Sequence, residues 1–227
     1  MRYLRNMKRL ALFCALCACL TLSCGKKQAE QLKTGDLIFV GIPADYTLDD
    51  GSMDAAITQA TGLADSLNLI HVAIAEVDAE GQAWVIDATI KYGVDRHPLD
   101  TFLTDFTLKD GSMPEFYIGR VQGVNAHAAV ERAKTYCGRA YDTRFLPDNE
   151  ELYCSELVQL SYLSAQGEQV FDSEPMNFLA PDGTMPVYWE QLFAILGMDV
   201  PQGVPGTNPQ AMFSSEKVKK VKKIFGD

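Results

Sequence analysis

Tyr153-Cys154-Ser155-Glu156-Leu157-Val158 begins an apolar stretch that continues to Gly167. Its apolar residues recur at helical spacing, which predicts a helix with Cys154 in the first turn. The free N–H groups and the dipole of a helix N-terminus stabilise a thiolate, which is the reactive form of cysteine. We therefore expect Cys154 to be a nucleophile, with its own backbone N–H as a donor to an oxyanion.

A thiol nucleophile needs a base, and three histidines follow the first 24 residues. His127 falls in the first turn of a predicted helix and is interpreted as a surface residue. His97 precedes Pro98 where a predicted strand runs into a loop. His71 begins the apolar segment His71–Val77, where a polar side chain is unusual unless it has a function or a hydrogen-bond partner. From the residues alone, His71 is either the base or a histidine whose bonds are satisfied at a strand end.

Asp87 is the candidate for the residue that orients the base. It interrupts the apolar run Trp84-Val85-Ile86-Asp87-Ala88, and buried acids are rarely unpaired. The turn-like residues 78–81 predict a hairpin between the segment from His71 and the segment that holds Asp87. A hairpin symmetric about that turn sets Asp87 directly opposite His71.

The remaining pattern predicts a mixed chain of the α+β class, an antiparallel sheet packed against helices. Strand signals gather between residues 71 and 122. Helices are expected at Met53–Leu67 (with Ser52 as a cap), Ala126–Gly138 (capped by Asn125) and Pro186–Leu196. The lysine-rich segment Ser214–Phe225 has apolar residues at helical spacing. It is interpreted as a terminal helix on the body, with a membrane-surface helix as the alternative.

The start of the chain has the pattern of an export signal. Met1–Arg9 is basic, Leu10–Leu22 is apolar but too short to span a bilayer, and Ser23-Cys24-Gly25 follows. Cys24 resembles the lipid-accepting cysteine of bacterial lipoproteins, although Thr21 replaces the usual leucine. We expect residues 1–24 to be a lipoprotein signal that anchors the protein in the bacterial cell envelope, at the periplasm or outer membrane. An ordinary cleaved signal and an uncleaved anchor are the alternatives.

Removal of that leader leaves 16 basic against 30 acidic residues, a net charge of −14. Such an acidic body argues against nucleic acid as a partner. Cys137 and Cys154 would remain as thiols, and a disulfide between them is the alternative. Cys137 is expected late in a helix as a small buried residue. No metal-ligand spacing or nucleotide-binding glycine loop is present, so no metal or cofactor is expected.

Several short motifs, taken in order, resemble the NlpC/P60 superfamily and its circularly permuted YiiX/YebB-like branch. They are Gly35–Phe39, His71–Ile74, Val85–Ala88, Tyr141-Asp142 and the segment Tyr153–Val158. In unpermuted members the cysteine helix comes before the other motifs, whereas here it follows them. The resemblance implies a papain-like fold, either a sheet or a small barrel, in a single domain over residues 25–227 with its core at about 33–197.

The resemblance also implies a thiol-dependent hydrolase with Cys154 as nucleophile, His71 as base and Asp87 as orienting residue. Many relatives have Glu in place of Asp87. Tyr141 and Tyr153 are candidates for lining the site or donating to the oxyanion, and packed aromatics are the alternative. The expected substrate is a small peptide or amide, such as a cell-wall fragment. A lipid-directed acyltransferase, phospholipase or esterase is the second hypothesis. A non-catalytic binding module is the third, and the presence of both Cys154 and His71 argues against it.

Overall fold

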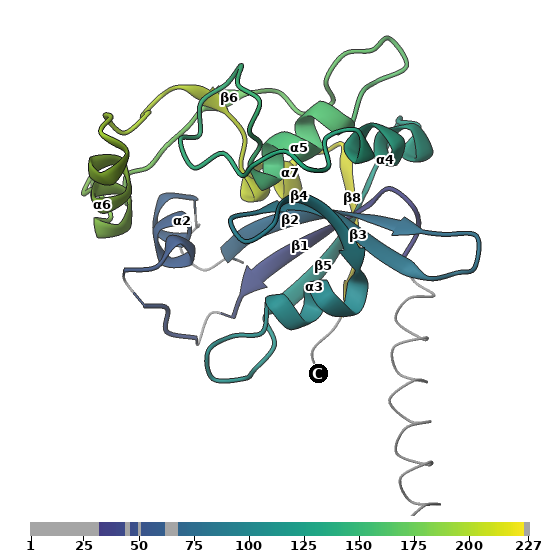
Figure 1. The fold of residues 1–227 in the computed structure, drawn as a ribbon, viewed down its shortest axis with the longest axis horizontal. Helices are drawn as coiled ribbons and strands as arrows, with labels where there is room; N and C mark the ends of the chain where they lie inside the picture. Colours follow the sequence, from purple (N-terminus) through teal and green to yellow (C-terminus); the bar gives the residue numbers. More distant parts are fainter. Residues whose placement is uncertain (1–31, 44–45, 50, 62–67, 225–227) are drawn as a thin grey trace, which may run out of the picture.

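The computed structural model describes residues 32–43, 46–49, 51–61 and 68–224 (Figure 1). The expected leader with Cys24, and the last part of the helix expected at Met53–Leu67, lie outside the described residues. Within those ranges, no helix is long and apolar enough to cross a bilayer.

A single antiparallel sheet forms the centre of the fold. Its strands lie in the order β4-β3-β2-β1-β5-β8, and each pairs antiparallel with its neighbours. Their bounds are β1 Asp36–Ile42, β2 Asn68–Val77, β3 Ala83–Thr89, β4 Gly93–Pro98, β5 Glu115–Val121 and β8 Val218–Ile224. A separate small pair joins β6 Glu174–Pro175 to β7 Pro205–Gly206.

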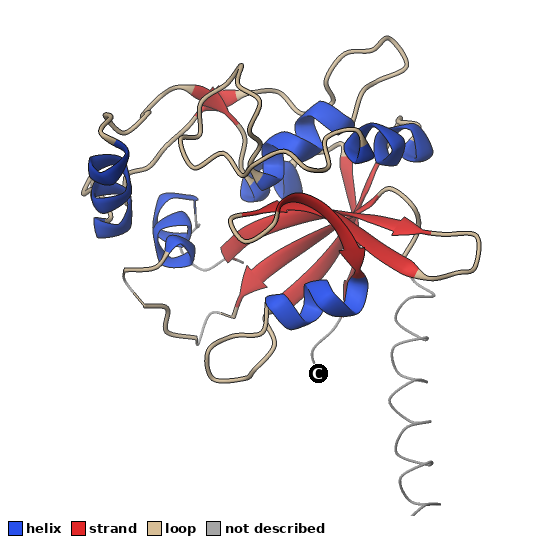
Figure 2. Ribbon diagram, in the orientation of Figure 1, coloured by secondary structure: helices blue, strands red, loops and turns tan. Residues whose placement is uncertain are grey.

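Helices cover both faces of the sheet (Figures 1 and 2). One face carries α4, α5 and α7, the other carries α3, and α2 and α6 lie together beside the sheet. Their bounds are α2 Met53–Thr61, α3 Leu99–Asp105, α4 Ala126–Lys134, α5 Cys154–Ser161, α6 Val187–Leu196 and α7 Pro209–Ser214. The expected caps are present, because Ser52 Oγ accepts from the Ala55 N–H at 3.2 Å and Asn125 Oδ1 from the Ala128 N–H at 3.1 Å.

Two apolar cores result from this layering. In β1, Leu37 and Phe39 pack with Leu157 and Val158 of α5 on one face. Ile38 belongs to the core on the α3 face. Every residue of β1 is buried, which is why its sequence reads as a continuous apolar run rather than an alternating one.

The expected α+β class is confirmed, but the prediction at the C-terminal end was wrong. Residues of Ser214–Phe225 form the edge strand β8 and not a helix, with Val218 opposite Val121 and Lys219 opposite Arg120. The backbone hydrogen bonds available along β5 decide this. The three-residue apolar spacing of the segment does not match one face of a strand, and Val221 is accordingly exposed. Lysines on an edge strand oppose pairing with other chains.

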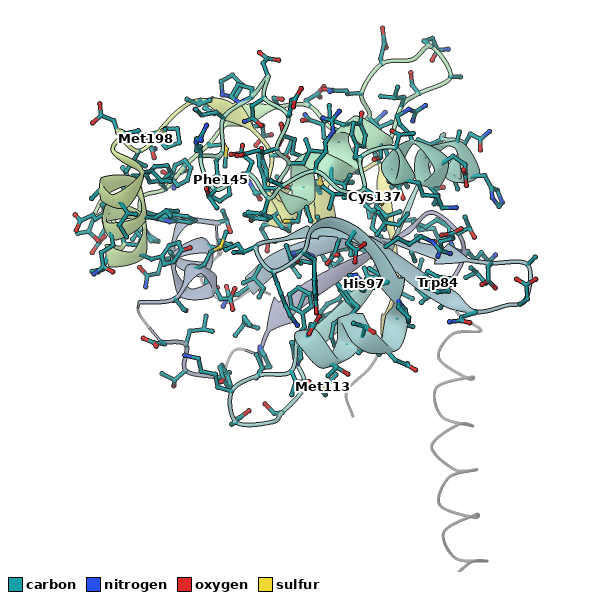
Figure 3. All side chains as sticks on the ribbon, viewed as in Figure 1. Trp84, His97, Met113, Cys137, Phe145 and Met198 are labelled. Carbon is teal, nitrogen blue, oxygen red and sulfur yellow. The ribbon has the colours of Figure 1, made fainter. Side chains whose placement is uncertain are left out.

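Cys137 also differs from expectation. The helix α4 ends at Lys134, and Cys137 lies in the turn after it, exposed (Figure 3). Both Cys137 and Cys154 are free thiols, so the alternative of a disulfide between them is excluded.

Candidate active site

Cys154 is the first residue of α5 and is buried, with 6% of its surface exposed. The preceding Tyr153 has extended backbone angles and makes no side-chain cap bond. The carboxyl of Glu156, three residues on, instead interacts with the Tyr153 N–H in the manner of half a capping box. The sulfur therefore stands at a helix N-terminus, where the helix dipole favours negative charge.

His71 lies in β2 and is bonded to Asp87 in β3. His71 Nε2 is 2.9 Å from Asp87 Oδ2, and both residues are buried. The imidazole packs on Phe106 with ring centroids 4.7 Å apart. A bulge between Val40 and Gly41 lies beside His71 in the β1–β2 ladder. Bulges of this kind are common next to active sites, where they redirect a side chain.

Cys154 and His71 are brought together. Burial alone would lower the pKa of His71, but attraction to Cys154 and hydrogen bonds to Asp87 and Cys154 outweigh it and raise that pKa to about 10. Because Asp87 occupies Nε2, Nδ1 is the nitrogen left to face the sulfur. At neutral pH His71 is therefore an imidazolium that lies between the Cys154 sulfur and the Asp87 carboxylate.

The β2–β3 hairpin has a different register from the one predicted. Ile74 is opposite Ile86 and Ala75 opposite Val85, which sets Ala73, rather than His71, opposite Asp87. The predicted register was wrong by two residues. A shift of two keeps a side chain on the same face of the sheet, and diagonal neighbours remain within reach of long side chains. The His71–Asp87 contact therefore forms even though the predicted pairing does not.

The two tyrosines have different surroundings. The hydroxyl oxygen of Tyr153 accepts from the Thr207 N–H at 3.1 Å, so this side chain joins two segments of the fold. Tyr141 lines the cavities on both the His71 side and the Cys154 side. Burial, followed by repulsion from Cys154, raises the pKa of Tyr141 well above its usual value. Tyr141 is therefore a neutral hydroxyl beside the sulfur, which is what an oxyanion donor requires.

The cavity beside His71 has a volume of about 360 Å³ and includes Asp54, Asp87, His97 and Tyr141 in its walls. The narrower space beside Cys154 is mainly apolar, with Ile57, Phe145, Phe178 and Trp189 in its walls. The His71 side therefore contains several polar groups, whereas the Cys154 side is almost wholly apolar.

The loop before Cys154 is attached to β4. The Val94 N–H donates to the Arg139 carbonyl at 2.8 Å, and the Gly138 N–H donates to the Val94 carbonyl at 2.8 Å. Gly93 has a φ of +67°, and a Cβ added there would lie 2.2 Å from the Arg139 carbonyl oxygen. The segment that carries Tyr141 is therefore held against the sheet by backbone contacts.

A family model described as the permuted papain-like amidase enzyme, YaeF/YiiX, C92 family, matches residues 31–222. The chain belongs to this family. The resemblance expected from the motifs is thereby confirmed, as are the papain-like fold and its permuted order. As a member of a family of amidases, the chain has a fold that supports hydrolysis of amide bonds.

Two relatives of this amidase-family chain come from Escherichia coli. The uncharacterized protein YiiX of strain K12 is 26% identical over 117 residues, which cover 50% of this chain and 57% of YiiX. The match thus spans less than two thirds of YiiX. The crystal structure of yiiX from O157:H7 has a TM-score of 0.65 and 24% identity, covering 86% of this chain and 99% of that one. This likeness shows a shared fold.

The O157:H7 protein is described as a metalloprotein. In the part of this C92-family chain that the structure describes, no group of three His, Cys, Asp or Glu side chains is arranged to hold a metal ion.

One histidine at the C92-family site was not predicted from the sequence. His97 in β4 is 7% exposed, and its Nε2 is 3.7 Å from Asp87 Oδ1. It was interpreted as a strand-exit residue because Pro98 follows it. Only the β3–β4 register, with Val85 opposite His97, shows that it shares a face with Asp87.

Proposed function

We propose that this protein is a thiol-dependent hydrolase that cleaves an amide bond through Cys154, His71 and Asp87. One observation carries the proposal: the His71 imidazole is hydrogen-bonded to Asp87 and interacts with Cys154 at the start of α5 strongly enough to raise its pKa. A nucleophile, a base and a group that orients the base are the three parts that acyl transfer to sulfur needs.

The steps follow from the positions of these groups. His71 holds the proton of the Cys154 thiol as an imidazolium, and the sulfur attacks the carbonyl carbon as a thiolate. The backbone N–H of Cys154 and the Tyr141 hydroxyl stabilise the oxyanion. His71 then gives its proton to the leaving amine as the carbon–nitrogen bond breaks and a thioester remains. Neutral His71 next takes a proton from water, whose oxygen attacks the thioester, and Cys154 leaves with the acid released.

Thiol labelling tests the nucleophile independently of substrate. The purified protein is treated with iodoacetamide at neutral pH, and the adducts are located by mass spectrometry. Faster labelling of Cys154 than of exposed Cys137, slowed at least about tenfold by His71→Ala, is expected. Labelling of Cys137 alone would reject the site. His127→Ala, an exposed histidine on α4, is the matched control.

For the substrate, we propose a short peptide or amide of cell-wall type first. The second candidate, a lipid acyl ester, is favoured by the apolar walls around Cys154. A panel of short γ-linked peptides and phospholipid vesicles separates the two, with Cys154→Ala as the blank. Release of a new amine supports the first candidate, whereas release of fatty acid without cleavage of any peptide supports the second.

A further inference from the structure

Asp87 is a buried carboxylate that uses only one of its two oxygens. It is 1% exposed, and its Oδ2 is bonded to His71. Its Oδ1 has no hydrogen-bond partner among the described residues. An unsatisfied buried acceptor destabilises the folded state, so this oxygen calls for an explanation.

The nearest donor is His97 on the neighbouring strand. His97 Nε2 lies 3.7 Å from Asp87 Oδ1, slightly beyond hydrogen-bond distance. Asp87 pairs with Asp95, and Val85 pairs with His97, so the two side chains are diagonal neighbours on one face. A shift of less than 1 Å in one side chain would complete the bond.

Packing fixes the His97 ring in this direction. The ring is close to parallel with that of Phe102 in α3, at 18° with centroids 6.3 Å apart. Phe102 also lies 6.1 Å from the His71 ring, so one phenyl group supports both histidines. The other nitrogen, Nδ1, is 3.8 Å from the partly exposed carboxylate of Asp95 and is itself without a hydrogen bond in the described structure.

We propose that His97 is a positioning residue for the hydrolase. Its Nε2–H holds Oδ1 of Asp87, so that the carboxylate cannot rotate and Oδ2 stays on His71. The two histidines thus hold the two oxygens of one carboxylate, and the orientation of the His71 ring toward Cys154 depends on both. His97 lines the cavity beside His71, but in this role it acts through Asp87 rather than on the sulfur. This inference rests on the proposed function, because it assigns His97 a role in the same site.

The test measures the rate constant for alkylation of Cys154 by iodoacetamide, in a Cys137→Ser background, from pH 6 to pH 9. His97→Phe keeps the ring and the stacking on Phe102 but removes the donor, and the rate is expected to fall about tenfold. His97→Gln returns an N–H donor near the position of Nε2 and is expected to keep the rate within about threefold. His127→Phe, on the exposed face of α4, should leave the rate unchanged.

A double-mutant cycle separates positioning from mere packing. In an Asp87→Asn background, His97→Phe is expected to cause no further loss in the alkylation rate, because the carboxylate that links His97 to His71 is already absent. The same tenfold loss in both backgrounds, or no loss in the parent protein, overturns the proposal. Thermal unfolding is followed for every variant. If His97→Phe does not fold, His97→Asn replaces it, because its shortened amide leaves Oδ1 without a donor.

Failure of this inference is distinguishable from failure of the proposed function. If His71→Ala does not slow alkylation, the Cys154–His71 pair itself is refuted. If His71→Ala slows it while His97→Phe does not, the hydrolase proposal stands and only the role of His97 is overturned.

Discussion

The charge on His71 depends on what surrounds it. In the unfolded chain its pKa is 6.5, whereas in the folded protein burial is outweighed by Cys154 and Asp87 and the pKa rises to about 10. A base whose pKa is raised by folding stabilises the protein fully below pH 6.5, and this contribution is lost as the pH rises through about 10.

Comparison of the parent protein with His71→Gln tests the direction in which this contribution to stability changes with pH. Urea unfolding at pH 6, 8 and 10 is expected to show the largest loss of unfolding free energy at pH 6, of about 2 kcal/mol, and a decreasing loss toward pH 10. His127→Gln is the control for removing an exposed histidine. A loss that grows with pH would contradict the assignment.

The proposed role of Tyr141 can be tested separately from that of Cys154. Tyr141→Phe removes one donor to the oxyanion and is expected to lower kcat about 100-fold on any amide that the protein cleaves. Alkylation of Cys154 forms no oxyanion, so its rate should hardly change. Tyr136→Phe, in the turn after α4 and outside the walls of both cavities, is the control. Equal losses in both assays would mean that Tyr141 acts on the sulfur instead.

Cys154, His71 and Asp87 could be selected as candidates from the sequence because each is a reactive or charged residue in a largely apolar segment, and the family resemblance then implied their roles. His97 could not, because its relation to Asp87 depends on the register of two strands and on the stacking with Phe102. The exposure of Cys137 depends on where α4 ends, and helix ends are set by capping geometry rather than by apolar spacing.

At the scale of elements, the start of α5 contains a buried acid. Burial, followed by repulsion from Asp142, raises the pKa of Glu156 from 4.5 to about 8. The folded protein therefore holds this proton more tightly than the unfolded chain. The carboxyl increasingly destabilises the fold as the pH rises from about 4.5 to about 8.

Glu156→Gln keeps the shape and the acceptor for the Tyr153 N–H but cannot ionise. It is expected to raise the free energy of unfolding by more than about 1 kcal/mol at pH 8 and to have little effect at pH 4. Urea unfolding at the two pH values measures this difference. Glu190→Gln, exposed in the first turn of α6, is the matched control. A uniform effect at both pH values would rule out the titration.

The strands and most helices were predictable because their apolar patterns are long. The edge strand β8 was not, since the choice between strand and helix was made by β5, a segment about a hundred residues earlier. The α3 and α7 helices were not predicted, and each has only six or seven residues. Pairing and packing within the whole fold decide such short segments.

At the scale of the molecule, the helix that begins with Cys154 follows the strands that hold His71 and Asp87, and the family match spans both. The body carries a large acid excess, while its first residues are basic and then apolar. The chain thus combines a fold that contains the candidate active site with an N-terminal segment whose composition is typical of export signals.

We propose that Cys24 carries a lipid in the bacterial envelope. Cys24→Ser is expected to move the expressed protein from the membrane pellet to the soluble fraction, or to leave it as the unprocessed precursor. Fractionation with an antibody, together with intact mass, measures this. Cys19→Ser, in the same leader, is the control. An unchanged membrane fraction with the mass of the full-length chain would favour an uncleaved anchor.

The close contact of Gly93 with the Arg139 carbonyl has a consequence for genetics. Position 93 offers no functional group, yet any side chain there would push away the loop of Tyr141 and shift the strand of His97. In a saturation mutagenesis screen scored by activity, its tolerance should resemble that of the reactive residues themselves. A screen would thus score Gly93 as intolerant of substitution although it takes no part in the chemistry.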